Sequence, residues 1–324
     1  MKKKIMSALI VLIILLMAIE VLLKSRYIIE AVSFSLKLWQ ENIFPSLFPF
    51  FVVSHLLINC GFASFLGELL RPFMYHLFRI KGEASFVLAM SLLSGFPSSA
   101  KYTRELYDKG LINEHEASKL LTFTHFSNPL FIIATVSIMF LNNQDVGLLI
   151  MICHYIPNII IGLLFRNYYV SKKDTSRVSL KYSFNLMHSK RLEAGKSFGL
   201  MISNALMNSI NTLLLVLGVV TMFLIITTII NQNLSLTLYN QSILNGILEM
   251  TQGLKYVSLL SIPLKNKAVL SVMFISFGGL SVHMQTIGLI SDTKIKYLPF
   301  FIARILHASI SGLLLYLSFD YWFM

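Results

Sequence analysis

Three short polar interruptions of apolar sequence hold the residues best suited to recognising a small solute. Two of them, 95–101 (Gly-Phe-Pro-Ser-Ser-Ala-Lys) and 278–281 (Gly-Gly-Leu-Ser), are expected helix breaks, and 249–253 (Glu-Met-Thr-Gln-Gly) precedes the second of them. Glycine permits a helix to break, and hydroxyl, amide and carboxylate groups beside the break form hydrogen bonds. Lipid cannot satisfy the backbone groups that a break exposes, so breaks are tolerated where they line a protein-enclosed cavity. The pattern predicts solute binding as in secondary transporters, whose substrate sites lie at such breaks between two repeats.

Proline and serine residues in these interruptions are expected to start the returning half-helices. Pro97 lacks a backbone donor and suits a first helical turn, while Ser98, Ser99 and Ser281 are of a type that caps helix N-termini. Two helix N-termini that converge on one place favour an anion such as a carboxylate. The alternative is a packing kink caused by glycine and proline alone.

Glu249 is the strongest ionisable candidate, because ionisable residues at membrane depth are functional by default. It lies beside a break, with Thr251 two residues further on. We expect its carboxylate to bind a proton or cation for coupling, or to hydrogen-bond a ligand; the alternative is an interfacial charge at a helix end. Lys101 follows the first break and would either offset a substrate's negative charge or extend to the cytoplasmic face.

A further interruption, Ser127-Asn128-Pro129, precedes another apolar run. Its hydroxyl and amide would complete a polar site, or the proline would simply end an interfacial helix. The full set of candidate substrate-binding residues is Gly95, Pro97, Ser98, Ser99, Lys101, Ser127, Asn128, Glu249, Thr251, Gly253, Gly278, Gly279 and Ser281.

The remaining ionisable residues do not form a catalytic pattern. Arg304 and His307 stand one helical turn apart and are expected to pair with Glu249 or Glu68. The histidines lack metal-ligand spacing, and the chain has no CxxC, phosphate-binding loop or G-x-S-x-G motif. We therefore expect no metal, no cofactor and no enzymatic activity.

The composition places these residues in a membrane protein. The chain has 324 residues, of which 56% are hydrophobic and 13% charged, and its net charge is +12. A globular domain carries about a quarter charged residues. The composition argues against a cytosolic enzyme, and basic loops between apolar runs explain the positive charge better than nucleic-acid binding does.

Apolar runs of about 20 residues predict an all-α polytopic fold with about six spans. Candidate spans cover 5–23, 43–60, 129–141, 146–165, 208–230 and 297–319, and two broken, re-entrant segments cover 84–109 and 265–291. The segment 166–196 carries eight Lys and Arg residues against two acidic residues, so it is expected in the cytoplasm. By this rule, loops rich in Lys and Arg lie in the cytoplasm. The lysines around the second broken segment would instead lie outside, so the orientation of the second half stays open.

The two broken segments suggest two inverted repeats. Glu68 precedes Gly95 by 27 residues, and Glu249 precedes Gly278 by 29 residues. We expect an N-terminal membrane anchor at 1–26, a first repeat at 40–165, a basic cytoplasmic loop at 166–196 and a second repeat at 197–324. The substrate site would lie where the two breaks meet.

Five segments in this order, 47–54, 94–101, 127–131, 249–253 and 276–279, resemble the YlbJ family of sporulation integral membrane proteins, within the nucleoside-recognition Gate-domain group. The resemblance runs from about residue 40 to the C-terminus, although 124–126 (Thr-His-Phe) departs from the family pattern. It implies inverted Gate-like repeats with helical hairpins in a multi-pass protein of the cell membrane. The implied role is to move dipicolinic acid into the forespore across the outer forespore membrane.

The expected function is thus a transporter or channel for a small organic anion. Two alternatives stay open: a nucleoside transporter, and a non-transporting scaffold of spore assembly that recruits proteins through 166–196. Expected partners are membrane lipid and the organic anion, with no nucleic acid. Self-association, or contact with other sporulation membrane proteins, is compatible with all three.

Overall fold

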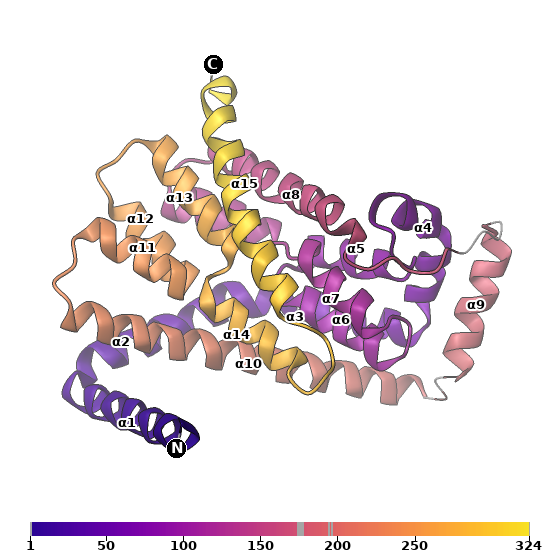
Figure 1. The fold of residues 1–324 in the computed structure, drawn as a ribbon, viewed down its shortest axis with the longest axis horizontal. Coiled ribbons are helices and arrows are strands. Elements are labelled where there is room, and N and C mark those ends of the chain that lie inside the picture. The colour runs from indigo at the N-terminus through magenta and orange to yellow at the C-terminus, as the bar shows by residue number, and fades with distance from the viewer. Residues whose placement is uncertain (1, 174–177, 194, 196, 324) are drawn as a thin grey trace.

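The computed structural model describes residues 2–173, 178–193, 195 and 197–323, and this part of the chain is helical without a strand. The expected all-α polytopic fold is confirmed (Figure 1). The helices are α1 (Lys2–Leu23), α2 (Ser25–Leu38), η1 (Trp39–Ile43), α3 (Phe44–Asn59), α4 (Phe62–Phe78), α5 (Ala84–Ser94), α6 (Ser98–Asp108), α7 (Glu114–Phe123), η2 (Phe131–Phe140), α8 (Asp145–Leu164), η3 (Phe165–Asn167), α9 (Leu180–Glu193), α10 (Phe198–Asn233), α11 (Leu238–Leu248), α12 (Met250–Leu259), α13 (Leu264–Phe277), α14 (Gly279–Ile290) and α15 (Leu298–Trp322).

Six helical stretches in the described chain are long and apolar enough to cross a membrane, which confirms the expected number. They are Lys4–Leu23, Ser25–Asn59, Asp145–Asn167, Phe198–Asn233, Leu264–Ile290 and Leu298–Trp322. The identity of two spans differs from expectation. The run at 129–141 forms only the short helix η2, because the chain is not helical between Phe123 and Pro129. The segment around Gly278, in contrast, is long enough to cross despite its break.

Four breaks interrupt the helices, and they are of two kinds. At 95–97 and at Glu249 the chain folds back, because α5 packs against α6 and α11 against α12 as helical hairpins. At 124–130 and at Gly278 the chain instead continues into a helix, η2 or α14, that does not pack on the preceding helix. Each half of the protein therefore contains one hairpin, then one broken helix, then one long helix, α8 or α15.

This order corrects the expected pairing of the breaks. The counterpart of the Gly95 turn is the Glu249 turn, and the counterpart of the Gly278 break is the break at 124–130. Packing between the halves follows the same correspondence. Helix α6 packs on α14, and its counterpart α12 packs on η2, the counterpart of α14. Likewise α15 packs on α7, and its counterpart α8 packs on α13, the counterpart of α7. Glu68 is not a counterpart of Glu249, since it lies within α4 and pairs with Arg71 at 3.2 Å.

The N-terminal segment and the basic segment 166–196 both contain a helix. Helix α1 stands apart from most of the other helices and packs mainly against α2 and α10 (Figure 1). The basic segment 166–196 is not simply a loop, because it contains α9, which packs against α4. Three charged residues of that segment, Asp174, Arg177 and Lys196, lie outside the described residues.

Gly253, a candidate substrate-binding residue, has a packing role in the hairpin of α11 and α12. A Cβ atom built on Gly253 would lie 2.2 Å from the Cα atom of Gly246. The two helices can approach this closely because Gly253 lacks a side chain, as in other small-residue contacts between membrane helices.

Replacing Gly253 with alanine should therefore destabilise the protein by about 1–3 kcal/mol, the usual cost of overpacking. The measurement is thermal unfolding of the purified protein in detergent. Gly218→Ala is the matched control, because Gly218 is also helical and a Cβ there would meet nothing within 4 Å. Equal stability of the two variants would contradict this role of Gly253.

Candidate functional site

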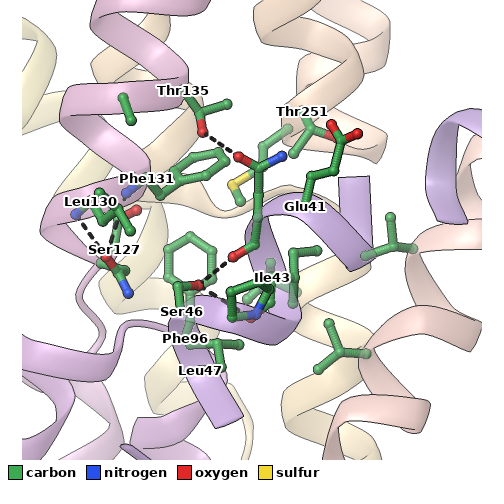
Figure 2. Close-up of a pocket in the computed structure, with 18 of the residues that line it drawn as sticks. Glu41, Ile43, Ser46, Leu47, Phe96, Ser127, Leu130, Phe131, Thr135 and Thr251 are labelled. Atoms are coloured by element: carbon green, nitrogen blue, oxygen red, sulfur yellow. Dashed lines mark hydrogen bonds between the residues drawn. The ribbon is translucent and has the colours of Figure 1, made fainter. Parts of the chain in front are cut away.

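The four breaks meet at one cavity of about 280 Å³ (Figure 2). The first hairpin turn contributes Phe96, and the second contributes Glu249 and Thr251. The break before η2 contributes Ser127 and Asn128, while α14 contributes residues of its first two turns. The rest of the wall comes from η1, α3, η2 and α10. The full lining set is Glu41, Asn42, Ile43, Pro45, Ser46, Leu47, Phe96, Ser127, Asn128, Leu130, Phe131, Ala134, Thr135, Val216, Val220, Glu249, Met250, Thr251, Val282 and Gln285.

Glycine at the breaks brings the segments into contact. A Cβ on Gly95 would lie 2.6 Å from the backbone nitrogen of Asn128, and Gly95 has φ of +78°. A Cβ on Gly279 would lie 3.0 Å from the backbone nitrogen of Met250. Side chains at Gly95 and Gly279 would push the first hairpin away from the η2 break and the second hairpin away from α14.

Two aromatic rings and three side-chain amides, those of Asn42, Asn128 and Gln285, line the cavity. Figure 2 shows Phe96 and Phe131 pointing into the space between the helices, with Thr251 across from them. Asn128 Oδ1 accepts from the backbone nitrogens of Leu130 at 2.7 Å and Phe131 at 3.4 Å, and so caps η2. Within the described chain its Nδ2 group has no acceptor, and the buried side chain of Gln285 makes no hydrogen bond.

Glu249 is 1% exposed and caps α12. Its Oε2 atom accepts from the Gln252 backbone nitrogen at 2.9 Å and from the Thr251 hydroxyl. Glu249 therefore lies at a helix end, as the alternative expects, and its side chain is buried there. The positive N-terminus of α12 is thus compensated by this carboxylate. Glu41 lies at the exposed edge of the cavity, 4.0 Å from Lys37.

The described lining residues include these two carboxylates and no Lys, Arg or His. Of the candidate residues, Ser127, Asn128, Glu249 and Thr251 line the cavity directly, and Gly95, Gly278 and Gly279 shape its walls.

The serines and proline have roles other than those expected. Pro97 precedes α6 and does not lie in its first turn, and α6 has no side-chain cap. Ser98 donates to the Gly95 carbonyl, while Ser99 lies 2.7 Å from the Thr124 hydroxyl and joins the first hairpin to the η2 break. Ser281 is buried within α14, which begins at Gly279. The expected capping was wrong because a capping residue must directly precede its helix. Helices α6 and α14 start too early for these serines, which therefore lie inside the helices.

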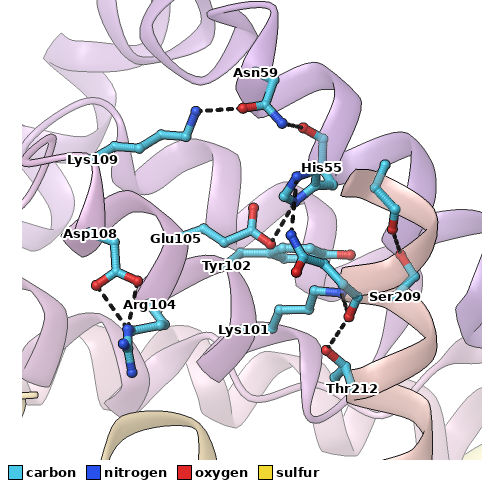
Figure 3. Close-up of polar contacts among 12 residues, drawn as sticks. His55, Asn59, Lys101, Tyr102, Arg104, Glu105, Asp108, Lys109, Ser209 and Thr212 are labelled. Atoms are coloured by element: carbon cyan, nitrogen blue, oxygen red, sulfur yellow. Dashed lines mark hydrogen bonds and ion pairs between the residues drawn. The ribbon is translucent and has the colours of Figure 1, made fainter. Parts of the chain in front are cut away.

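Lys101 does not line the cavity. It is buried beside α3 and α10, where its Nζ atom lies 4.2 Å from the centre of the Phe51 ring and donates to the Asn208 carbonyl at 3.3 Å (Figure 3). The same face of α6 carries Glu105, whose Oε1 atom lies 3.2 Å from His55 Nδ1. The expected role of Lys101 in offsetting a substrate's charge is not seen, since Lys101 does not line the cavity. It holds α6 in place.

The expected pairing of Arg304 and His307 with Glu249 or Glu68 is wrong. The two residues pair with each other, at 2.6 Å between Nη1 and Nδ1, and with neutral groups of α7 and α8. Sequence reasoning also missed Phe96, Phe131 and Gln285 as lining residues. A usable signal existed for Gln285 alone, since it is a polar residue one turn after Ser281 on the broken helix.

The chain is similar in sequence to known membrane proteins. The Gate family, described as "Nucleoside recognition", matches residues 41–144. The sporulation integral membrane protein YlbJ of Bacillus subtilis (strain 168) is 37% identical over 305 residues, which cover 86% of this chain and 74% of the relative. The chain belongs to the YlbJ family of sporulation integral membrane proteins. No solved structure matches the fold.

Membership places the chain among multi-pass membrane proteins of sporulation, which agrees with the six apolar helices. The matched Gate segment contains the first hairpin, the η2 break and η2 itself. The family resemblance drawn from the five sequence segments is thereby confirmed.

The cap geometry of Glu249 separates its structural role from any role in binding. Glu249→Ala removes the acceptor for the α12 N-terminus and should lower stability by about 1–2 kcal/mol, as loss of an N-cap does. Glu249→Gln retains a side-chain oxygen at the same place and should lose less. Thermal unfolding in detergent measures both, and an alanine variant as stable as wild type would contradict the capping role.

Proposed function

We propose that this protein is a transporter or channel for a small organic anion, dipicolinate (pyridine-2,6-dicarboxylate), rather than an enzyme or a scaffold. The substrate site is the cavity, and the membrane is the outer forespore membrane of the sporulating cell. The observation that carries the proposal is the convergence of four helix breaks on one cavity, because broken helices in a membrane belong to solute pathways.

The cavity wall suits a flat heteroaromatic ring with acceptor groups. Phe96 and Phe131 offer aromatic surface for stacking. The amide nitrogens of Asn128 and Gln285 and the hydroxyl of Ser127, which has no partner within the described residues, are donors for carboxylate oxygens. The volume of about 280 Å³ lies near the lower end for small-molecule sites, as a compact solute requires.

A nucleoside is the second candidate. The Gate match is described as nucleoside recognition, and Glu249 and Thr251 offer oxygen acceptors for the amino groups of a base. Dipicolinate has no such amino groups. Competition therefore separates the two cargos.

The test is uptake of labelled dipicolinate into proteoliposomes that contain the purified chain in both orientations. We expect saturable uptake that an excess of uridine or adenosine does not reduce. Absence of uptake by folded protein, or uptake that nucleosides abolish, would contradict the proposed cargo.

Asn128→Asp tests whether the cavity is the site. Aspartate keeps the oxygen that caps η2 but replaces the Nδ2 donor with negative charge, so uptake at low substrate concentration should fall roughly tenfold or more. Asn113→Asp is the matched control, because Asn113 also caps a helix, α7, through its Oδ1 atom but does not line the cavity. Equal uptake by both variants would place the site elsewhere.

A further inference from the structure

Arg304 is a fully buried cation on α15 without an acidic partner among the described residues. Its guanidinium donates to the Thr122 carbonyl, to the His125 carbonyl at 3.4 Å and to Asn158 Oδ1 at 3.1 Å. Its remaining hydrogen-bond partner is the ring nitrogen of His307, and its Cζ atom lies 5.4 Å from the centre of the Phe300 ring. A buried charge that meets only neutral acceptors costs several kcal/mol, so its presence calls for a reason beyond packing.

The hydrogen bonds around Arg304 show that two neighbouring histidines, His154 and His307, are neutral. His307 Nδ1 accepts from Arg304, and its Nε2 donates to the His154 carbonyl at 2.7 Å. His154 Nε2 accepts from the Ser127 backbone nitrogen at 2.8 Å, and its Nδ1 lies 2.9 Å from Ser276 Oγ. Each ring therefore uses one nitrogen as an acceptor, which a protonated imidazole cannot do. Arg304 is the one charge of this network.

The charge lies directly behind the cavity wall. Arg304 binds the carbonyls of Thr122 and His125, immediately before the lining residues Ser127 and Asn128. The His125 ring stacks on Phe96, another lining residue, with 4.7 Å between ring centres. The backbone of 122–126 and the His125 ring thus connect the guanidinium to the cavity wall.

We propose that Arg304 sets the preference of the cavity for an anionic solute. The inference rests on the proposed function, and it explains how a cavity lined by two carboxylates and no basic side chain would accept an anion. Across a thin layer of low dielectric, a full positive charge acts on the cavity with little screening. Arg304 is therefore a specificity residue that acts through the η2 break without touching the ligand.

The test compares two probes of the same shape: pyridine-2,6-dicarboxylate and the neutral pyridine-2,6-dicarboxamide. Binding of each to purified protein gives a ratio of dissociation constants. Wild type should prefer the dicarboxylate, and Arg304→Gln should reduce this preference roughly tenfold, the effect of one charge at moderate distance. Arg304→Lys, which keeps the charge, should retain most of the preference.

Arg26→Gln is the matched control, since it removes one arginine charge at an exposed ion pair on α2 and should leave the ratio unchanged. Asn158→Asp guards against a misfolded Arg304→Gln protein. It keeps Arg304 and the acceptor oxygen 3.1 Å away but supplies a neutralising carboxylate. It also loses the bond from Nδ2 to the His125 carbonyl, so its thermal stability is measured alongside. The ratio should fall as in Arg304→Gln.

A ratio that stays at the wild-type value in Arg304→Gln and Asn158→Asp would overturn the inference and leave Arg304 a purely structural residue. Wild-type protein that binds neither probe would overturn the proposed function and the inference with it. Wild-type protein that binds the two probes equally would overturn the inference alone.

Discussion

The structure depends on one constraint: backbone groups freed by a helix break within a membrane must find partners inside the protein. At the second hairpin the Glu249 carboxylate binds the free nitrogens of α12. At the η2 break Asn128 caps the following helix, while His154, Asn158 and Arg304 bind backbone groups from Thr122 to Ser127. Polar residues at membrane depth are thus concentrated where the breaks are.

This constraint also explains how the two halves are joined. The partners of the η2 break come from α8 in the first half and from α13 and α15 in the second, through the bonds of His154 to Ser276 and of Arg304 to Asn158. The cavity cannot form from either half alone, because its wall combines the turns of both hairpins with both broken helices. A solute in it would contact both halves at once, as alternating access between repeats requires.

The sequence was sufficient to predict the all-α fold, the number of apolar spans and three of the four breaks; the turn at Glu249 was missed. Glycine and proline signal breaks through local geometry, which is readable without tertiary structure.

The correspondence of Gly95 with Gly278 was wrong because a chain that folds back at a break and one that continues have similar local sequences. The capping of α6 by Ser98 and of α14 by Ser281 was wrong by one to three residues, since helix starts are decided by tertiary contacts. The partners of Arg304 were beyond prediction, because three of its acceptors are backbone carbonyls or an amide with no charge pattern.

The central claim is that the cavity at the four breaks holds the solute. Its most direct test is solute protection of a single cysteine at Thr135, which lines the cavity, in a background with Cys60 and Cys153 replaced by alanine. The rate of labelling by a small thiol reagent is measured with and without saturating dipicolinate. We predict slower labelling of Thr135→Cys in its presence and no change at the exposed position of Leu214→Cys on α10. Equal rates at Thr135→Cys with and without dipicolinate would contradict it.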